Sequence, residues 1–413
     1  MRVMFLNPTG QPGGAESSLV DILASLRLAE PSWPLHLLAA SDGPLIGLVR
    51  SLGVTAEVLP FPPAIARLGE HGATRSGTAG GILRFAAQTV LAAVGAVRYR
   101  AALGRAINAF DPAIVHTNGL KMHVLAAWEI GSSRRPGLVW HLHDYLGTRP
   151  MTTRLLSLHH GATVVANSAS VAADATHALA NRTRVVTIRN GVDLGRFSIA
   201  GVRANLDAMS GLSQAPANTV RVGLVATLAR WKGHATFLEA IARLPRHLPV
   251  RAYIVGDAMY QTEGSQYSLD ELRQLARSLG IADRVGFTGF VHTPEATFRA
   301  LHVVVHASTA PEPFGLVIAE AMACGRAVVV SNAGGAAEIV TPGVDALVHA
   351  PGDAGDLSTQ IAALASDAEL RARIGHAARA TAERSFDRAR LATELIPVYK
   401  DVAERAGRGR AGL

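Results

Sequence analysis

Short runs of apolar, often β-branched residues alternate along the whole chain with longer stretches rich in alanine and leucine. In the first half the short runs lie at 3–6, 36–40, 114–116, 138–141, 163–166 and 185–188. Six more follow at 222–226, 252–255, 285–288, 302–306, 327–330 and 346–348. Continuous apolar runs of this length between helical segments are typical of parallel strands buried on both faces. The pattern therefore predicts an α/β chain with two doubly wound, Rossmann-like sheets.

Residues 193–219 separate the two series of strands and are rich in small and polar residues. We therefore expect one domain over 1–195 and a second over 196–386. The remaining segment, 387–413, has apolar residues at helical spacing, which predicts a packing helix and tail that could cross back to the first domain. Ligands of open α/β sheets bind beyond the carboxyl ends of the strands. We expect the functional site in a cleft where two such sheets face each other.

The composition is that of a packed globular protein. Apolar residues make up 49% and charged residues 17% of the 413 residues, which excludes a disordered chain. The single cysteine, Cys324, excludes a disulfide framework and a cysteine-rich zinc site. No apolar run reaches the roughly 18 residues that span a bilayer, and the first apolar stretch is too short for a signal peptide. We expect a cytoplasmic chain.

The net charge of +8 is concentrated in the first half of the sequence. Residues 1–195 hold 17 Lys and Arg against 11 Asp and Glu, an excess of six, and residues 196–413 hold 23 against 21, an excess of two. An apolar helical segment at 85–97 is followed by several arginines. It would be a core helix with a solvated basic end, or a helix that docks on the periphery of an anionic membrane. The sequence leaves both open.

Several common catalytic motifs are absent. No G-x-G-x-x-G follows a strand, and there is no P-loop, H-E-x-x-H or G-x-S-x-G motif. No D-x-D pair is present to hold a divalent metal on a diphosphate. An anionic ligand would therefore be neutralised by backbone amides and basic side chains.

Two loops that follow predicted strands suit an anion. In the first, Gly13 and Gly14 come where a helix begins, and a helix N-terminus favours negative charge. In the second, Arg230 and Lys232 precede a helix. Only three of the 40 basic residues are lysines, so Lys232 draws attention. A flexible loop and a solvated basic turn are the competing interpretations.

The segment 310–325 turns from a strand into a helix and carries two glutamates. Glu312 precedes the turn, and Glu320 lies among apolar residues inside the helix. An unpaired carboxylate in such surroundings is costly, and a hydroxyl-bearing ligand would satisfy it. Stabilisation of the helix dipole or a surface position would also account for these charges.

The pair Glu312 and Glu320 resembles the E-x7-E signature of family 4 (glycosyl transferases group 1), the retaining glycosyltransferases of GT-B fold. Other motifs match in the order of that family: Gly13-Gly14-Ala15-Glu16, His143-Asp144, Asn190-Gly191-Val192-Asp193, Lys232-Gly233, Gly256-Asp257, Gly289-Phe290-Val291, and Gly334-Gly335 with Glu338. The resemblance covers about residues 1–350. Two positions depart from the pattern, because Thr227 stands where the family has a diphosphate-binding arginine and Arg326 replaces a proline before a strand.

The resemblance implies that the first domain binds an acceptor and the second a nucleotide-diphosphate sugar, with UDP or GDP as the nucleotide, no other cofactor and no metal. Glu320 would bind the ribose, and the backbone of Phe290 and Val291 the base. The diphosphate would be held by Arg230, Lys232 and the amides of Gly14, Phe314, Gly315, Leu316 and Val317.

The resemblance further implies catalytic roles for Glu312, His143 and Lys232. The acceptor, a glycan or a lipid-linked intermediate of an envelope polysaccharide, would contact His116, Asn118, Lys121 and Asp144. No nucleic-acid partner is implied. The acceptor would attack on the face from which the diphosphate leaves, so no protein nucleophile is needed and electrostatic stabilisation dominates. An epimerase or phosphorylase of the same architecture, and an inactive scaffold in polysaccharide assembly, are the alternatives.

Overall fold

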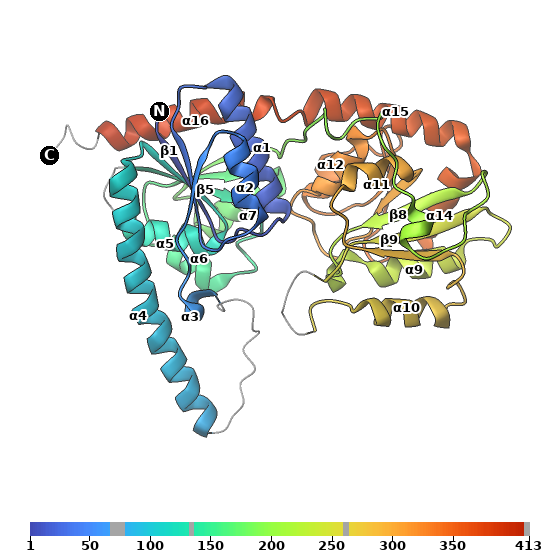
Figure 1. Ribbon diagram of the computed structural model, residues 1–413, viewed down its shortest axis with the longest axis horizontal. Coiled ribbons are helices and arrows are strands. Elements are labelled where there is room, and N and C mark those ends of the chain that lie inside the picture. Colours follow the sequence, from blue (N-terminus) through green and yellow to red (C-terminus); the bar gives the residue numbers. More distant parts are fainter. Residues whose placement is uncertain (67–78, 132–135, 259–263, 409–413) are drawn as a thin grey trace. The chain divides into compact units, whose positions relative to one another are not determined.

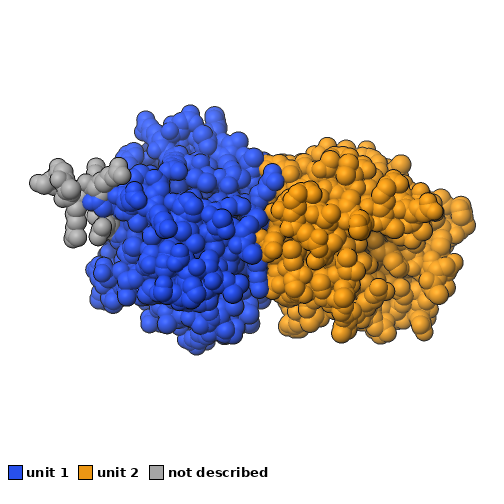
Figure 2. All heavy atoms as spheres, turned by 90° about the horizontal axis from the view of Figure 1, so that it is seen from above, with its two compact units in different colours: residues 1–191, 388–413 blue, residues 192–387 orange. Residues whose placement is uncertain are grey.

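The chain folds into two compact units (Figure 2). The computed structural model describes residues 1–66, 79–131, 136–258 and 264–408. Unit 1 comprises Met1–Gly191 and Arg388–Leu413, and unit 2 comprises Val192–Asp387.

Unit 1 contains a sheet of seven parallel strands in the order β3-β2-β1-β4-β5-β6-β7. Figure 1 labels β1 and β5 of this sheet and the helices around it. The strands are β1 (Val3–Asn7), β2 (Leu35–Ala39), β3 (Thr55–Val58), β4 (Ile114–Asn118), β5 (Gly137–Leu142), β6 (Thr163–Ala166) and β7 (Arg184–Thr187). The helices are α1 (Gly14–Ala29), α2 (Pro44–Ser51), α3 (Pro63–Ala66), α4 (Ala79–Phe110), α5 (Leu120–Ile130), α6 (Pro150–Leu156), α7 (Ala169–Ala178) and α16 (Arg390–Arg408). The strand order reverses between β1 and β4, and ligands of such sheets bind at that point.

Unit 2 contains six parallel strands in the order β10-β9-β8-β11-β12-β13. The strands are β8 (Val220–Val225), β9 (Val250–Val255), β10 (Val285–Gly289), β11 (Val303–His306), β12 (Ala327–Ser331) and β13 (Leu347–His349). The helices are α8 (Leu206–Met209), α9 (His234–Arg243), α10 (Leu269–Ser278), α11 (Pro294–Ala300), α12 (Leu316–Ala323), α13 (Gly335–Glu338), α14 (Ala354–Ser366) and α15 (Ala368–Ser385). Here the order reverses between β8 and β11.

Each sheet is covered on both faces, as continuous apolar strands require. In unit 1, α1, α2 and α16 share one core with the sheet, and α4, α5, α6 and α7 share the other. In unit 2, α9, α10 and α14 pack on one face, and α11, α12 and α13 on the other, with α15 contributing to both cores. The two Rossmann-like sheets of the predicted fold class are confirmed.

All twelve predicted strands are present, and one strand was missed. β3 lies at the edge of the sheet of unit 1, where only Ala56 of its four residues is buried. An edge strand with polar residues on its exposed positions lacks the continuous apolar run on which the prediction relied. Residues 193–219, which we interpreted as the connection, lie inside unit 2.

The helix expected at 85–97 is part of α4, and its side chains up to residue 93 lie outside the described residues. From residue 94 onward, α4 buries Tyr99, Leu103 and Ile107 in the core of unit 1 and exposes Val94 and Val97. This part of α4 is a packing helix. Among the described residues, no helix combines the length and the hydropathy needed to cross a bilayer.

Candidate functional site

Lys232 and Glu312 form the centre of the candidate site in unit 2. The loop after β8 carries a short 3-10 helix, η1 (Arg230–Lys232), followed by Gly233 in the left-handed conformation with φ 76°. A Cβ atom on Gly233 would lie 1.8 Å from the carbonyl oxygen of Ala307, so glycine lets this loop lie against the end of β11. The Lys232 ammonium then donates to both carboxylate oxygens of Glu312, at 2.9 and 2.7 Å.

The Glu312 carboxylate is buried and has further partners. Its Oε2 accepts from the Ser308 hydroxyl at 3.0 Å and lies 3.2 Å from His306 Nε2. Its carbonyl oxygen accepts from the Gly335 N–H at 2.7 Å, which gives the second glycine of the Gly334-Gly335 motif a role. Burial alone would raise the pKa of Glu312, but the Lys232 charge and the His306 contact hold it well below its usual range. Glu312 is therefore an anion at neutral pH.

His306 and Ser308 were not predicted from the sequence. Burial lowers the pKa of His306, although Glu312 partly offsets this effect, so the imidazole is neutral at pH 7. The Ser308 hydroxyl lies 3.0 Å from His306 Nε2 and joins it to the carboxylate. The sequence did contain a signal for them. They are polar residues two positions apart at the end of an apolar strand, and side chains at that spacing point to the same side.

The amino end of α12 offers free backbone donors beside Glu312. Gly315 precedes the helix with φ 92°, and a Cβ atom there would meet Ile318 Cδ1 at 2.6 Å. Within the described part of the chain, the N–H groups of Leu316 and Val317 have no hydrogen-bond acceptor. Free amides and the helix dipole together favour an anion at this end.

Phe314 and Glu320, the other two predicted residues of segment 310–325, differ in their exposure to solvent. The Phe314 side chain is buried and packs edge-on against Phe386, with 6.0 Å between ring centroids. It anchors the turn, so only its backbone is open to a ligand. Glu320 lies in the second turn of α12 and is half-buried.

Arg230 does not join Lys232 in this structure. Its guanidinium donates to the Glu271 carboxylate at 2.7 Å and to the Gly264 carbonyl at 3.0 Å. It also lies over the Tyr267 ring, 4.3 Å from the centroid. Because the ion pair is exposed it is weak, and a diphosphate would compete with it for the arginine.

Phe290 and Val291 follow β10 on a surface loop. The Phe290 side chain is 45% exposed and its ring lies edge-on to His292, with 5.0 Å between centroids. Val291 is half-buried against the core of unit 2. The loop thus presents an exposed ring and backbone, as a contact to a base requires.

In unit 1, hydrogen bonds link the side chains of Asn7, Asn118 and His143, which lie at or just after the ends of β1, β4 and β5. Asn118 Nδ2 donates to Asn7 Oδ1 at 2.7 Å and to the Ala15 carbonyl at 3.3 Å, so its amide orientation is determined. Asn118 Oδ1 then faces His143 Nε2 at 2.6 Å. Because this oxygen can only accept, His143 carries its proton on Nε2 and leaves Nδ1 as an acceptor. Asn7 was missed as a partner.

Burial shifts the pKa values of two groups around these hydrogen bonds. Burial lowers the pKa of His143 to about 4, so the imidazole is neutral at pH 7. Burial raises the pKa of Glu16, although the hydrogen bond that Asn7 donates at 3.2 Å partly offsets this. Gly14 is the first residue of α1 beside Glu16, and a Cβ atom there would meet open space.

The remaining acceptor candidates lie in different surroundings. His116 is fully buried, and its Nδ1 is 2.7 Å from the Tyr399 hydroxyl of α16, so its side chain is a core group without access to an acceptor. Lys121 donates to the Ala66 carbonyl at 2.6 Å. Asp144 is exposed in the loop after β5. The expectation for His116 is therefore corrected, since its position at the end of a buried strand directs it inward.

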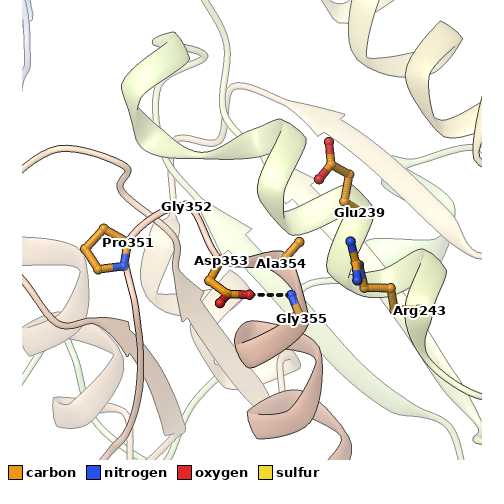
Figure 3. A pocket seen from close by; sticks show the side chains of 7 residues that line it. All are labelled: Glu239, Arg243, Pro351, Gly352, Asp353, Ala354 and Gly355. Carbon is orange, nitrogen blue, oxygen red and sulfur yellow. Dashed lines mark hydrogen bonds between the residues drawn. The ribbon is translucent and has the colours of Figure 1, made fainter.

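A hollow of about 420 Å³ lies elsewhere on unit 2, between α9 and the amino end of α14 (Figure 3). It is lined by Glu239, Arg243, Pro351 and the residues around Asp353. Asp353 accepts from the Gly355 N–H at 2.8 Å and so caps the helix itself. None of the predicted site residues lines it. Among the described residues, no group of three or more His, Cys, Asp or Glu side chains is arranged to hold a metal ion.

Two family models match the chain. "Glycosyltransferase Family 4" matches residues 80–196, and "Glycosyl transferases group 1" matches residues 213–381. The first match lies in unit 1 apart from its last five residues, and the second lies in unit 2 and contains Lys232, Glu312 and Glu320.

Curated relatives match part of the chain. A D-inositol 3-phosphate glycosyltransferase of Xylanimonas cellulosilytica is 31% identical over 54% of this chain and 52% of its own length. The lipopolysaccharide core biosynthesis glycosyltransferase LpsE of Rhizobium meliloti is 30% identical over 59% of this chain and 65% of its own length. The chain spans about half the length of most of the curated relatives it matches.

Solved structures match nearly the whole chain. Anabaena Alr3699/HepE in complex with UDP-glucose aligns with a TM-score of 0.75 and 28% identity over 97% of this chain and 100% of that one. WaaG, a glycosyltransferase involved in lipopolysaccharide biosynthesis, aligns with a TM-score of 0.66 at 15% identity, which supports the fold alone. The paired family models, the two parallel sheets and the glutamate pair lead to one conclusion: the chain belongs to the family 4 (glycosyl transferases group 1) glycosyltransferases of GT-B fold.

Proposed function

We propose that this protein is a retaining glycosyltransferase that moves a sugar from a nucleotide-diphosphate sugar to an acceptor. The observation that carries the proposal is the ion pair of Lys232 and Glu312 beside the free amides of α12. A buried carboxylate suits the hydroxyl groups and the cationic carbon of a reacting sugar. The ammonium and the amides suit the diphosphate that leaves it.

Lys232 and the start of α12 bind the diphosphate in this proposal. An ammonium has three N–H donors, and two of those of Lys232 are used by Glu312. The third donates to a phosphate oxygen, and the N–H groups of Leu316 and Val317 donate to others. Glu320, half-buried on the same helix, accepts from the ribose hydroxyls. These groups neutralise the diphosphate without a metal ion.

The transfer step balances without a protein nucleophile. The bond between the sugar's anomeric carbon and the β-phosphate oxygen breaks as the acceptor oxygen bonds to the same face of that carbon. The departing phosphate oxygen takes the acceptor's proton. Glu312 stabilises the positive charge that develops on the sugar, and Lys232 stabilises the negative charge on the leaving group, a type of contribution worth about 3–4 kcal/mol for a well-placed donor.

The donor is proposed to be a UDP-sugar, with a GDP-sugar as the alternative. HepE, which resembles this chain over nearly its whole length, is described in complexes with UDP and with UDP-glucose. The backbone of Phe290 and Val291 would contact the base, and an exposed aromatic ring suits stacking.

Unit 1 is assigned to the acceptor. Its His143 presents a neutral imidazole whose Nδ1 accepts a hydrogen bond from a hydroxyl group of the bound acceptor, while Asp144 and Lys121 offer polar contacts. The excess of six positive charges in residues 1–195 suits an acidic or lipid-linked acceptor. The relatives named for inositol 3-phosphate and lipopolysaccharide core support an acceptor of this kind.

The proposal is tested with Glu312→Gln, which keeps the shape of the side chain and removes its charge. Glu369→Gln, at an exposed position of α15, is the matched control. Release of UDP and transfer of labelled sugar to an envelope lipid extract should fall at least about 100-fold in Glu312→Gln and stay unchanged in Glu369→Gln. Full transfer by Glu312→Gln would contradict the catalytic assignment.

Incubation with the donor alone separates the alternatives. An epimerase would interconvert the donor sugar without an acceptor, and a phosphorylase would need inorganic phosphate. A scaffold would turn over no nucleotide sugar at all. The proposal expects sugar transfer only when an acceptor is present, apart from slow hydrolysis.

A further inference from the structure

A row of basic residues lies at the amino ends of three neighbouring strands of unit 2. In the register of the sheet, Val303 of β11 pairs with Val222 of β8 and with Ala327 of β12. The residues immediately before them are Arg221, His302 and Arg326, which therefore stand at one level across three strands. Lys232 and Glu312 follow the carboxyl ends of β8 and β11. The basic row is at the amino ends of these strands and so lies at the opposite end of the sheet from the candidate donor site.

The three side chains of this row share one face of the sheet. Val222, Val303 and Ala327 point into the core formed with α9 and α14. Because successive side chains of a strand alternate, Arg221, His302 and Arg326 point to the other face. Like charges on neighbouring strands of one face are unfavourable, so this row needs negative charge nearby.

Two more arginines lie around His302. Arg203 precedes α8 and Arg371 lies in α15. Burial, together with the charges of Arg371, Arg221, Arg326 and Arg203, lowers the pKa of His302 to about 4. The Arg221 N–H donates to His302 Nδ1 at 2.9 Å, which leaves Nε2 of the neutral ring with its hydrogen as a donor.

One carboxylate in this region, Asp207, is already neutralised. It accepts from Arg251 at 2.7 Å, from the Tyr253 hydroxyl at 2.6 Å and, at the longer distance of 3.4 Å, from Arg221. Burial would raise the pKa of Asp207, but these donors hold it well below its usual range. Asp207 thus forms ion pairs with both Arg251 and Arg221, and its single charge balances only one of the two.

Two of the arginines, Arg203 and Arg326, keep their charge unbalanced. Among the described residues, Arg326 donates only to the carbonyl groups of Cys324, at 2.9 Å, and Leu301, at 3.2 Å. Within the described part of the chain no carboxylate pairs with Arg326 or with the exposed Arg203. The region therefore has an excess of positive charge that the protein itself does not compensate.

Arg203, Arg221 and His302 border a hollow of about 280 Å³. Its polar lining comprises Arg203, Arg221, His302, Asp207, Asn205 and Gln214. The guanidinium groups and the His302 N–H match phosphate oxygens, and the amide side chains match hydroxyl groups. The volume accommodates a phosphate group with a small polar skeleton.

We propose that this hollow binds the phosphate group of a small phosphorylated metabolite, such as a sugar phosphate, at a site separate from the donor site. Arg326, which departs from the family's pattern, does not line the hollow but adds to the positive charge around His302. The inference goes beyond glycosyl transfer. It stands whether or not that activity is confirmed, because it rests on residues at the amino ends of the strands, away from Lys232 and Glu312.

The test uses the full-length protein and two probes, inorganic phosphate and glucose 6-phosphate, at constant ionic strength. Arg203→Glu reverses one charge at an exposed residue whose side chain has no hydrogen-bond partner among the described residues, and Arg277→Glu on α10 is the matched control. Calorimetric titration should show saturable binding of at least one probe, weakened about tenfold or more by Arg203→Glu and unchanged by Arg277→Glu. Lys232→Ala should also leave it unchanged.

Four results would overturn the proposal. These are the absence of saturable binding to both probes, equal affinity in Arg203→Glu, and loss of binding in Lys232→Ala, which would place the phosphate at the donor site. The fourth is binding that depends on Arg203 only with phosphatidylglycerol vesicles and not with the two soluble probes, which would make the patch a membrane contact.

Discussion

Replacing Lys232 by alanine isolates the contribution of one cation to diphosphate binding. The ammonium makes two charge-assisted bonds to Glu312 and is proposed to make a third to the donor. A hydrogen bond to a charged group contributes about 1.5–3 kcal/mol. The Lys232 side chain is 21% exposed, which screens the interaction in part, so we take about 2 kcal/mol. At about 1.4 kcal/mol per tenfold change, the dissociation constant of UDP should rise about 30-fold.

The assay compares UDP with uridine by calorimetric titration at pH 7. Uridine lacks the diphosphate, so its affinity should be the same in Lys232→Ala and in the unmodified protein. Lys232→Arg keeps the charge and should lose less UDP affinity than Lys232→Ala. An unchanged affinity for UDP, or an equal loss of affinity for UDP and uridine, would refute the reasoning, because Lys232 would then not act on the diphosphate.

Lys232→Ala should also change the free energy of unfolding, by an amount that depends on pH. The pKa of Glu312 is held low in the folded protein, so its ion pair stabilises the fold above the ordinary carboxyl pKa near 4.5 and loses that effect as the pH falls. Removing one partner of an ion pair costs about 1 kcal/mol at the surface and 3–5 kcal/mol in the interior. With side chains 21% and 11% exposed, we expect about 2 kcal/mol. Thermal unfolding of Lys232→Ala should show this loss at pH 7 and a smaller one below pH 4, and an equal loss at both would contradict the ion-pair account.

Three further predictions concern other parts of the site. Gly315→Ala forces an L side chain into φ 92° with Ile318 2.6 Å away, so it should lower stability by about 1–3 kcal/mol and weaken UDP binding, as melting and titration would show. Asn118→Asp places an anion near His143 Nε2, so NMR titration should find the His143 pKa raised from its value of about 4, and the rate should then fall as the pH drops through the raised pKa. EDTA should leave the rate unchanged, and a strict requirement for Mg²⁺ would contradict neutralisation by Lys232 and amides.

The strands that could be predicted are those with a continuous apolar run. Each central strand is buried on both faces, so its apolar composition alone identifies it as a buried parallel strand. β3 was missed because Thr55, Glu57 and Val58 are exposed at the sheet edge. Backbone hydrogen bonds to β2 hold this strand in the sheet. Such bonds do not require apolar side chains, so the amino-acid sequence does not reveal them.

The site was predictable where the chemistry depends on local motifs. Glu312, Lys232 and the amides of α12 lie on loops that follow neighbouring strands at the switch point, so the sequence order places them together. The partners of Arg230 could not be predicted, because Glu271 lies 41 residues away on another helix. His116 was misplaced for a related reason, since its partner Tyr399 comes from α16, 283 residues later.

The anomeric configuration of the transferred sugar tests the central claim most directly. UDP-glucose, in which the sugar is α-linked, is incubated with the protein, EDTA and an envelope lipid extract, and the anomeric proton of the first product is recorded by NMR. The account predicts release of UDP together with an α-linked product, both lost in Glu312→Gln. A β-linked product, or turnover that survives in Glu312→Gln, would contradict it.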